Sequence, residues 1–282
     1  MPTALVVGAT GNVGSRLVPH LARRGHTVRA ATRDPDAYDG ADAEPVRFDY
    51  DDRATWPAAL DGADHLFLIP KNADPEPEQT LIPFLDAAEE AGVERVVLMT
   101  AVGVENTERG LRTVEEHLDG LSVDATILRP NWFMQNFYPG WLYPMIQHGG
   151  TITLPAGEAR TAFVDAEDIA EMAAAVLTED GHAGAAYTVS GPEALTYGEA
   201  AAVLSDASGR TITYQSVPDS AMREALADQG WYDEQAELMA DLFAAVRQNY
   251  AAETGGDVEH VLGRPPRSLR RYAEAHADAF RA

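Results

Sequence analysis

The sequence contains no cysteine and a single lysine, Lys71, among its 282 residues. Without cysteine, the chain has no disulfide, no thiolate nucleophile and no zinc–cysteine site. The eight histidines are scattered without the spacing of a metal-binding motif, so no metal site is expected. No apolar run approaches the roughly 20 residues of a membrane span, and no signal-peptide pattern is evident. These absences predict a cytoplasmic protein that needs neither metal nor membrane.

Basic residues are also scarce, because 21 Lys and Arg stand against 45 Asp and Glu, which gives a net charge of −24. Such an acidic surface repels a phosphate backbone and argues against nucleic-acid binding. Two causes compete: adaptation of an acidic proteome to high salt, and a GC-rich genome that replaces lysine by arginine. Codon bias alone does not produce a large negative charge, so a halophilic source is the favoured interpretation.

The residues that are present indicate an α/β protein. Through the first half of the chain, short runs rich in Val, Ile and Leu alternate with amphipathic stretches, which predicts βαβ units and a parallel sheet covered on both faces. The predicted strands are residues 4–7, 27–31, 46–48, 64–69, 95–99 and 124–128, and the clearest helices are residues 12–24 and 76–91.

The pattern changes after Pro130, where an aromatic-rich segment begins. Strands are predicted at residues 151–154, 185–190 and 211–214, and helices at 164–177 and 195–209. The last helix carries a Thr196–Glu199 capping box and a terminal Gly209. Asp165 and Asp168 open the preceding helix, so capping and dipole stabilisation explain them better than acid–base catalysis.

The first predicted strand leads into GATGNVG, with glycines at 8, 11 and 14 directly before a helix. Such a loop permits a tight turn, a close approach to a pyrophosphate and close helix packing, and the helix dipole faces the phosphates. In this context the motif predicts dinucleotide binding. The contacts predicted from it are Gly8, Thr10, Gly11, Asn12, Val13 and Gly14.

At the end of the second strand, VRAATRDPD, Thr32 stands at about the point where an NAD-selective site usually has an acid, and Arg33 follows it. A guanidinium clamps a 2′-phosphate, so NADP(H) is expected in preference to NAD(H); the alternative is that Arg33 is a solvated surface residue. Asp49 and Tyr50 are predicted beside the adenine, and Ile69, Pro70 and Lys71 beside the middle of the cofactor, although Lys71 fits a solvated loop equally well. Thr100, Ala101 and Pro130, which end two further strands, complete the predicted contacts.

With GATGNVG, ATRDPD, VVLMTAVG and ILRPNWFMQNF in this order, the chain resembles the NmrA-like branch of the atypical short-chain dehydrogenases/reductases over nearly its whole length. Through FDYDDRATW, FVDAEDIA and GPEALTYGEAAAVLS it looks closest to the ergot-alkaloid reductases (agroclavine and festuclavine dehydrogenase-like). The resemblance implies a doubly wound Rossmann domain over residues 1–130 and a small α/β substrate lobe over 131–282, with a cleft between them. Some segments of the lobe are expected to return to the Rossmann sheet.

Neither a tyrosine nor a lysine lies between Thr100 and Gly120, where a short-chain dehydrogenase carries its proton-donating pair. That general-acid step is worth roughly 10²–10⁴ in rate for a ketone. A quinone, iminium ion or conjugated enone needs it less, because positioning supplies most of the catalysis. Many members of the branch lack the pair. Thr100 and Asn131 are the positioning candidates, and no catalytic acid is assigned.

The aromatic segment predicts a lining for a flat ligand at the edge where α/β sheets bind substrates. The predicted substrate contacts are Asn131, Trp132, Phe133, Asn136, Phe137 and Trp141. The alternative is that these aromatics join the small lobe to the sheet. Two functions follow: an NADPH-dependent reductase of a planar, electron-poor small molecule, or a non-catalytic redox sensor of the NmrA type that acts through a protein partner.

Overall fold

The computed structural model describes residues 1–71, 74–228 and 230–281. Its internal contacts divide the chain into two compact units. Unit 1 contains Met1–Pro130, Ala166–Val189 and Asp257–Arg264, and unit 2 contains Asn131–Asp165, Ser190–Gly256 and Pro265–Ala282. Each unit is therefore made of three separate segments of the chain.

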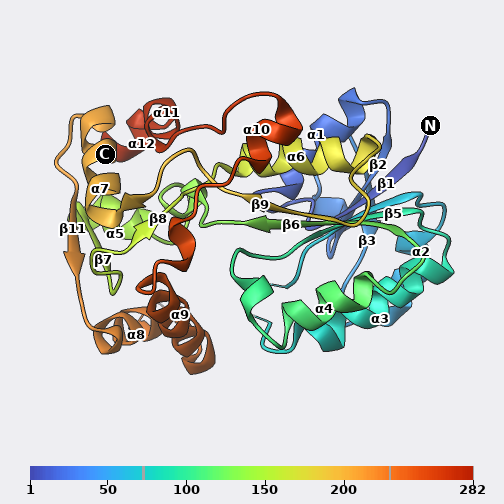
Figure 1. The fold of residues 1–282 in the computed structure, drawn as a ribbon, viewed down its shortest axis with the longest axis horizontal. Coiled ribbons are helices and arrows are strands. Elements are labelled where there is room, and N and C mark those ends of the chain that lie inside the picture. The colour runs from blue at the N-terminus through green and yellow to red at the C-terminus, as the bar shows by residue number, and fades with distance from the viewer. Residues whose placement is uncertain (72–73, 229, 282) are drawn as a thin grey trace. The chain divides into compact units, whose positions relative to one another are not determined.

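Unit 1 is built on a seven-stranded parallel sheet with the order β3-β2-β1-β4-β5-β6-β9 (Figure 1). The strands are β1 (Thr3–Val7), β2 (Thr27–Thr32), β3 (Glu44–Arg47), β4 (His65–Leu68), β5 (Arg95–Met99), β6 (Asp124–Pro130) and β9 (Ala185–Val189). The strand order reverses between β1 and β4, and ligands bind at such a reversal, outside the carboxyl ends of the strands. The parallel sheet predicted from the sequence is confirmed.

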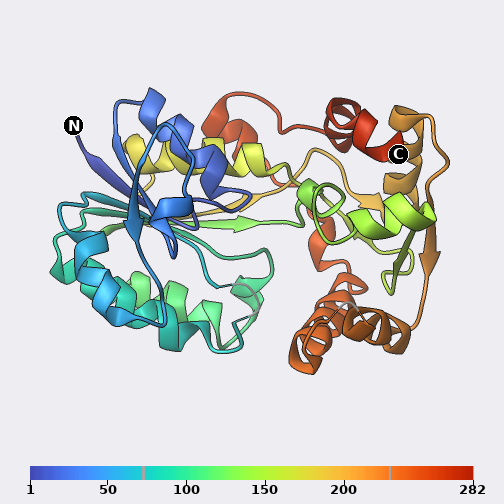
Figure 2. The same ribbon diagram turned by 180° about the vertical axis from the view of Figure 1, so that it is seen from behind.

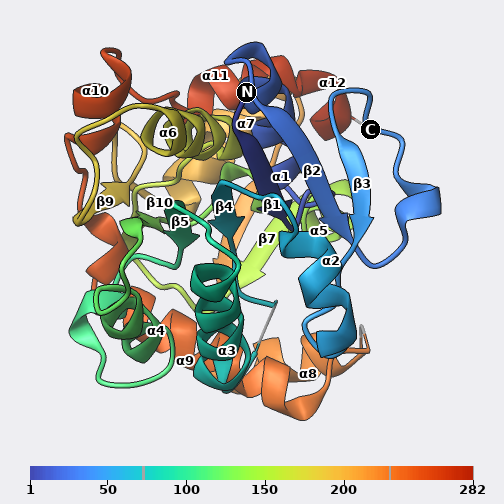
Figure 3. The ribbon, with the colours of Figure 1, turned by 90° about the vertical axis from the view of Figure 1, so that its right-hand side faces the viewer.

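Helices cover both faces of this sheet, as the doubly wound prediction requires. On one face lie α1 (Gly14–Arg23) and α6 (Ala166–Thr178), with α10 (Asp257–Leu262) against α6. The other face is covered by α2 (Trp56–Leu60), α3 (Pro77–Glu90) and α4 (Leu111–Leu118), as Figures 2 and 3 show.

Close packing on the two faces has different causes. The buried alanines of α6, among them Ala170, Ala173 and Ala174, are small enough to let α1 and α6 lie directly against each other. Across the sheet, the Phe84 ring of α3 packs 4.9 Å from Phe48 and 5.2 Å from Trp56, measured between ring centroids. Aromatic pairs at these distances stabilise beyond the area they bury.

Unit 2 has two small sheets and its own aromatic core. The strands β7 (Thr151–Leu154) and β11 (Thr213–Ser216) are parallel, whereas β8 (Arg160–Thr161) and β10 (Leu195–Thr196) are antiparallel. Its helices are α5 (Tyr143–Gly149), α7 (Tyr197–Ser208), α8 (Asp219–Asp228), α9 (Asp233–Val246), α11 (Leu269–Ala275) and α12 (Ala277–Arg281). Helices α8 and α9 pack side by side (Figure 1).

The termini of α7 form as the sequence predicts. Thr196 accepts a hydrogen bond from the Glu199 N–H at 3.1 Å, and the Glu199 carboxylate accepts one from the Thr196 N–H at 2.9 Å. Gly209 ends the helix with a φ of 74°. Glu167 and Asp168 lie in the first turn of α6, where negative charge complements the helix dipole. Among the described residues, no helix has both the length and the apolarity needed to cross a membrane.

Candidate functional site

The loop between β1 and α1 is shaped by two of its glycines. Gly8 has a φ of +74°, which glycine adopts freely, and its carbonyl accepts a hydrogen bond from the Gly11 N–H at 2.9 Å. A Cβ atom on Gly14 would lie 2.2 Å from the Gly8 carbonyl oxygen. Helix α1 therefore begins against the β1 turn only because residue 14 has no side chain.

The first turn of α1 offers donors to an anion. Thr10, Gly11 and Asn12 are exposed. Within the described part of the chain, the backbone N–H groups of Asn12 and Val13 donate to no other residue. Free N–H groups and a helix N-terminus together form a site for phosphate. The residues of this loop therefore fit the pyrophosphate of a dinucleotide.

The chain after β4 passes close to the same loop, because a Cβ on Gly8 would lie 2.3 Å from the Ile69 Cδ1. Tyr50 supports this segment by donating its hydroxyl to the Ile69 carbonyl at 2.5 Å. Its ring lies 4.8 Å from that of Phe48, and burial raises its pKa well above the usual range. Its hydroxyl is therefore bound to the backbone and its half-buried ring packs against the core, while its contact with adenine stays a prediction.

Lys71 is not an isolated solvated lysine. Its ammonium lies 2.8 Å from the Asp51 carboxylate, and this hydrogen bond raises the pKa of Lys71. The Asp49 carboxylate accepts a hydrogen bond from the Asp51 N–H at 3.0 Å, so Asp49 lies in the same half-buried loop after β3. Contacts of Asp49, Ile69, Pro70 and Lys71 with a cofactor stay predictions.

Two exposed arginines lie near the carboxyl ends of β2 and β3. Arg33 follows β2, whose last residue Thr32 is paired in register with Arg47 of β3. Both arginines are exposed, and neither forms an ion pair within the described residues. Their guanidinium groups are thus available to a phosphate. Sequence analysis missed Arg47, although its position at the end of the third strand was the available signal.

At the ends of β5 and β6, a buried carboxylate occupies the region in which the sequence lacks a tyrosine–lysine pair. Glu115 of α4 is fully buried and accepts hydrogen bonds from the Thr100 hydroxyl at 2.8 Å and from the Arg129 Nε at 3.0 Å. Arg129 Nη2 and Arg112 Nη1 bind the second oxygen at 2.6 and 3.2 Å. Burial raises the pKa of Glu115, but these hydrogen bonds outweigh it and hold the pKa below its ordinary value.

This cluster supplies no acid. Glu115 is ionised at neutral pH, arginine keeps its proton, and the Thr100 hydroxyl already donates to the carboxylate. Thr100 therefore serves to fix the end of β5, and any effect on a hydride acceptor is indirect. Pro130 is also engaged, since its carbonyl accepts from the Val102 N–H at 3.0 Å, and Ala101 lies half-buried between these residues.

Most of the aromatic segment packs inside unit 2. Phe137 is fully buried, 5.1 Å from the ring of Phe163, so the prediction that it contacts substrate is corrected. Trp132 and Trp141 pack on Phe243 of α9 at 5.1 and 6.3 Å, and the Trp132 indole donates to the Tyr250 hydroxyl. These contacts hold the two tryptophan rings in place within unit 2, and both rings are half-buried.

The polar residues of the segment are used in the same way. The Asn131 amide is buried, donates to the Ala251 carbonyl at 2.9 Å and accepts from the Trp132 N–H at 2.8 Å. These hydrogen bonds give Asn131 a role in folding unit 2, and its role in positioning an acceptor stays a prediction. Phe133 and Asn136 remain half-buried, and their contact with substrate stays a prediction.

One group of potential metal ligands escaped sequence analysis. His20, Glu167 and Glu171 bring their ligand atoms within 4.8 Å of one another. Arg264 binds both Glu171 and Asp168, and Arg16 lies 3.8 Å from Glu167, so cationic side chains already neutralise these carboxylates. We assign the group as an ion-pair network that joins α1, α6 and the segment ending at Arg264. Local spacing gave no signal, because His20 and Glu167 are 147 residues apart.

Comparison with known proteins agrees with this geometry. The NmrA-like family model matches residues 2–274. An NAD(P)H azoreductase from Xenophilus azovorans is 33% identical over 99% of both chains. Festuclavine synthase I from Penicillium roqueforti is 32% identical over 96% of this chain and 97% of its own.

Among solved structures, the NADPH complex of the quinone oxidoreductase QOR2 from Escherichia coli superimposes with a TM-score of 0.84 and 25% identity. The match covers 96% of this chain and 99% of that one. The resemblance to the ergot-alkaloid reductases inferred from the sequence is confirmed by the festuclavine relative. The match to the family model spans almost the whole chain, and the chain therefore belongs to the NmrA-like family.

Proposed function

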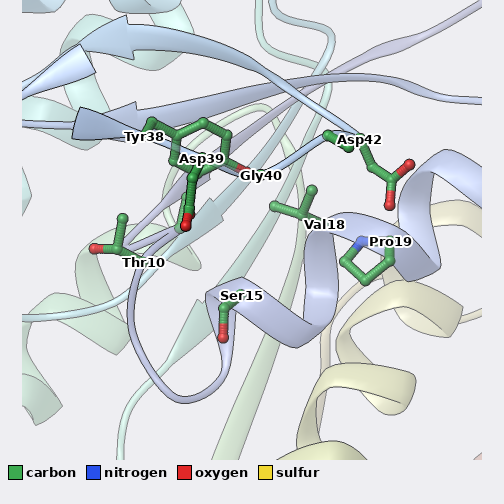
Figure 4. Close-up of a pocket in the computed structure, with 10 residues that line it drawn as sticks. Thr10, Ser15, Val18, Pro19, Tyr38, Asp39, Gly40 and Asp42 are labelled. Carbon is green, nitrogen blue, oxygen red and sulfur yellow. The ribbon is translucent and has the colours of Figure 1, made fainter. Parts of the chain in front are cut away.

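We propose that this chain is an NADPH-dependent oxidoreductase that reduces a planar, electron-poor small molecule. The observation that carries the proposal is the start of α1, which forms one wall of the pocket in Figure 4. There Gly14 lies against the Gly8 carbonyl, and the N–H groups of Asn12 and Val13, which donate to no other described residue, are left for a pyrophosphate. Bound NADPH would supply the hydride. The residues of unit 1 bind and orient the cofactor, and Arg33 and Arg47 attract its 2′-phosphate.

The class of acceptor follows from the cluster around Glu115. With that carboxylate ionised and Thr100 donating to it, this region offers no proton to a developing alkoxide. A quinone, an iminium ion or a conjugated enone takes hydride without such an acid, and solvent completes any protonation. The names of the azoreductase and quinone oxidoreductase relatives support acceptors of this kind.

The test is NADPH consumption by the purified protein against a panel of quinones, cyclic iminium salts, enones and simple ketones, at high salt. We expect turnover with at least one of the first three classes and none with the ketones. Arg33→Ala is expected to weaken NADPH binding several-fold. Arg223→Ala serves as the control, because this half-buried arginine of α8 belongs to unit 2 and pairs with Glu237.

Two outcomes would contradict the proposal. Turnover of simple ketones would show that a proton donor exists and that the acceptor class is wrong. Tight binding of NADPH without turnover of any acceptor would favour the non-catalytic sensor, and a search for a protein partner would follow.

A further inference from the structure

Three hydroxyl groups of unit 2 have no hydrogen-bond acceptor among the described residues. The hydroxyls of Thr161 and Tyr197 are fully buried and have no hydrogen-bond partner there. The Tyr250 oxygen accepts a hydrogen bond from the Trp132 indole N–H at 3.0 Å, but its own proton has no acceptor in the described part of the chain. Because a hydroxyl both donates and accepts, each of these three groups has a proton left to donate.

The residues that carry these hydroxyls are brought together by β8. Thr161 ends β8, and this strand pairs with β10, which leads directly into Tyr197 at the start of α7. The next residue, Ala162, donates its N–H to the Ala251 carbonyl at 2.8 Å, so the segment that carries Tyr250 runs beside β8. Burial, and then the nearby Tyr250, raise the pKa of Tyr197. Among the described residues, hydroxyl donors therefore outnumber their acceptors in this part of unit 2.

Tyr250 is the member of this group that a ligand can reach. It is half-buried, whereas the other two hydroxyl residues are fully buried. Trp132 and Trp141 are half-buried as well, and their rings pack on Phe243, with centroids 5.1 and 6.3 Å from its centroid. A phenol with a proton to donate is thus held beside aromatic rings that are partly accessible, and such rings stack on a flat ligand.

The protonation of Tyr250 decides which ligand fits. Burial raises the pKa of Tyr250, and the hydrogen bond from Trp132 opposes the rise without cancelling it, so the phenol keeps its proton at neutral pH. No carboxylate of the described residues contributes to this pKa, so Tyr250 has no anion beside it to attract a cation. A phenol donates to a lone pair, which the carbonyl oxygen of a quinone or enone has and the nitrogen of an iminium ion lacks.

We infer that Tyr250 is a specificity-determining residue whose hydroxyl donates a hydrogen bond to a carbonyl oxygen of the acceptor, while the rings of Trp132 and Trp141 lie against the plane of the acceptor. The proton stays on Tyr250, so this contact binds the acceptor and solvent still completes its protonation. The inference rests on the proposed function and deepens it, because it narrows the acceptor to a neutral quinone or enone and disfavours an iminium ion.

The test is the dissociation constant of 1,4-naphthoquinone and of naphthalene for the whole protein, measured by isothermal titration calorimetry. NADP⁺ is present, because the oxidised cofactor cannot reduce the quinone. The two probes share a planar ring system, and only the quinone has carbonyl oxygens, so the wild type should bind the quinone more tightly. Tyr250→Phe is expected to weaken naphthoquinone about three- to tenfold, the range of one neutral hydrogen bond, and to leave naphthalene and NADP⁺ unchanged.

The matched control is Tyr197→Phe, which removes a fully buried hydroxyl without a partner in the described residues and should change the affinity for neither probe. Failure of naphthoquinone to bind the folded wild type would overturn the inference. Equal weakening of both probes in Tyr250→Phe, or an equal loss of quinone affinity in the two variants, would overturn it as well, because Tyr250 would then act only through packing.

The proposed function has a separate outcome. It fails if no acceptor of the panel oxidises NADPH, whatever the binding of naphthoquinone. Turnover of iminium salts in preference to quinones and enones would contradict the role of Tyr250 and leave the proposed function intact.

Discussion

Glu115 and Arg129 form a two-point ion pair inside unit 1, with Nε–Oε1 and Nη2–Oε2 distances of 3.0 and 2.6 Å. The planar guanidinium matches the carboxylate, so the pair fixes the orientation of both side chains. Because Arg129 belongs to β6 and Glu115 to α4, the pair joins the sheet edge to the helix after β5. The carboxylate of this rigid ion pair thus lies in the region between Thr100 and Gly120, in which the sequence has neither tyrosine nor lysine.

Removing the buried carboxylate is expected to destabilise the protein strongly. Glu115→Ala would remove the buried carboxylate that binds Arg129 and Arg112, and would leave Arg129 with only the more distant Glu105 carboxylate at 3.7 Å. Breaking a buried pair costs about 3–5 kcal/mol of unfolding free energy. Urea unfolding measures the difference. The control is Glu116→Ala on the same helix: its side chain is 59% exposed, and a change below about 1 kcal/mol is expected. Equal effects of the two substitutions would contradict the assigned role of Glu115.

Gly14→Ala tests the start of α1. The added methyl meets the Gly8 carbonyl oxygen at 2.2 Å, and both contacting segments are backbone, so the helix must move. Overpacking of this kind costs about 1–3 kcal/mol, and the displaced N–H groups should also weaken NADPH binding. Gly149→Ala in α5, where a Cβ meets nothing within 4 Å, is the control and should be neutral to stabilising. If Gly14→Ala left the affinity for NADPH unchanged, the glycine loop would not be the site that holds the phosphates.

A buried histidine pair should make stability fall in mild acid. The rings of His26 and His65 lie 5.2 Å apart, and three of their nitrogens have no hydrogen-bond partner among the described residues. Burial lowers both pKa values; the charge of Arg95 adds to the effect on both rings and that of Arg24 to the effect on His26, whereas the Asp64 carboxylate opposes it.

The sign follows from proton binding. Because the folded-state pKa values lie below the ordinary histidine value of 6.5, the unfolded chain binds protons first. The stability that neutral histidines provide is present above that pH and is lost as the pH falls below it. Thermal unfolding between about pH 8 and 5 should show a smaller decrease in His65→Gln than in the wild type. His148→Gln, at an exposed site, should retain the wild-type decrease; a wild-type-like decrease in His65→Gln would rule out the pair.

Salt is expected to stabilise the protein. A net charge of −24 repels itself in the folded state, and raising the ionic strength shortens the Debye length from about 10 Å at 0.1 M to about 3 Å at 1 M. The midpoint of thermal unfolding should therefore rise with KCl, and an uncharged solute of equal osmolality should raise it less. A midpoint that falls with KCl would mean that the ion pairs, such as Arg129–Glu115, outweigh the repulsion.

The fold of unit 1 was largely predictable because its strands are short apolar runs between amphipathic helices. Each of the six strands predicted before Pro130 forms in place, although β3 begins and ends earlier, at Glu44–Arg47, and β6 extends to Pro130. The position of β9 at the sheet edge beside β6 was not predicted, because local periodicity carries no information about which strands pair. The same limit applies to the two-residue strands β8 and β10.

The site could be predicted only where consecutive residues determine its shape. The glycine loop needs glycine at both of its ends, residues 8 and 14, because their backbones approach each other closely. Its shape is therefore encoded by seven consecutive residues. Glu115 gave no signal, because a buried glutamate looks like a surface residue until Arg129, 14 positions later in sequence, folds against it. The function of the aromatic segment after Pro130 was hard to predict for a related reason. An aromatic residue such as Phe137 suits the lining of a ligand pocket and a hydrophobic core equally well.

The interleaving of the two units has a consequence for synthesis on the ribosome. The chain passes from one unit to the other after residues 130, 165, 189 and 256 and again after 264, so neither unit is complete until late in translation. Until β9 emerges, β6 is an open edge of a parallel sheet, the kind of exposed strand that pairs with other chains. A fragment ending at residue 130 would keep the whole glycine loop and still expose that edge. The nucleotide-binding half of this protein is therefore expected to aggregate when it is produced alone.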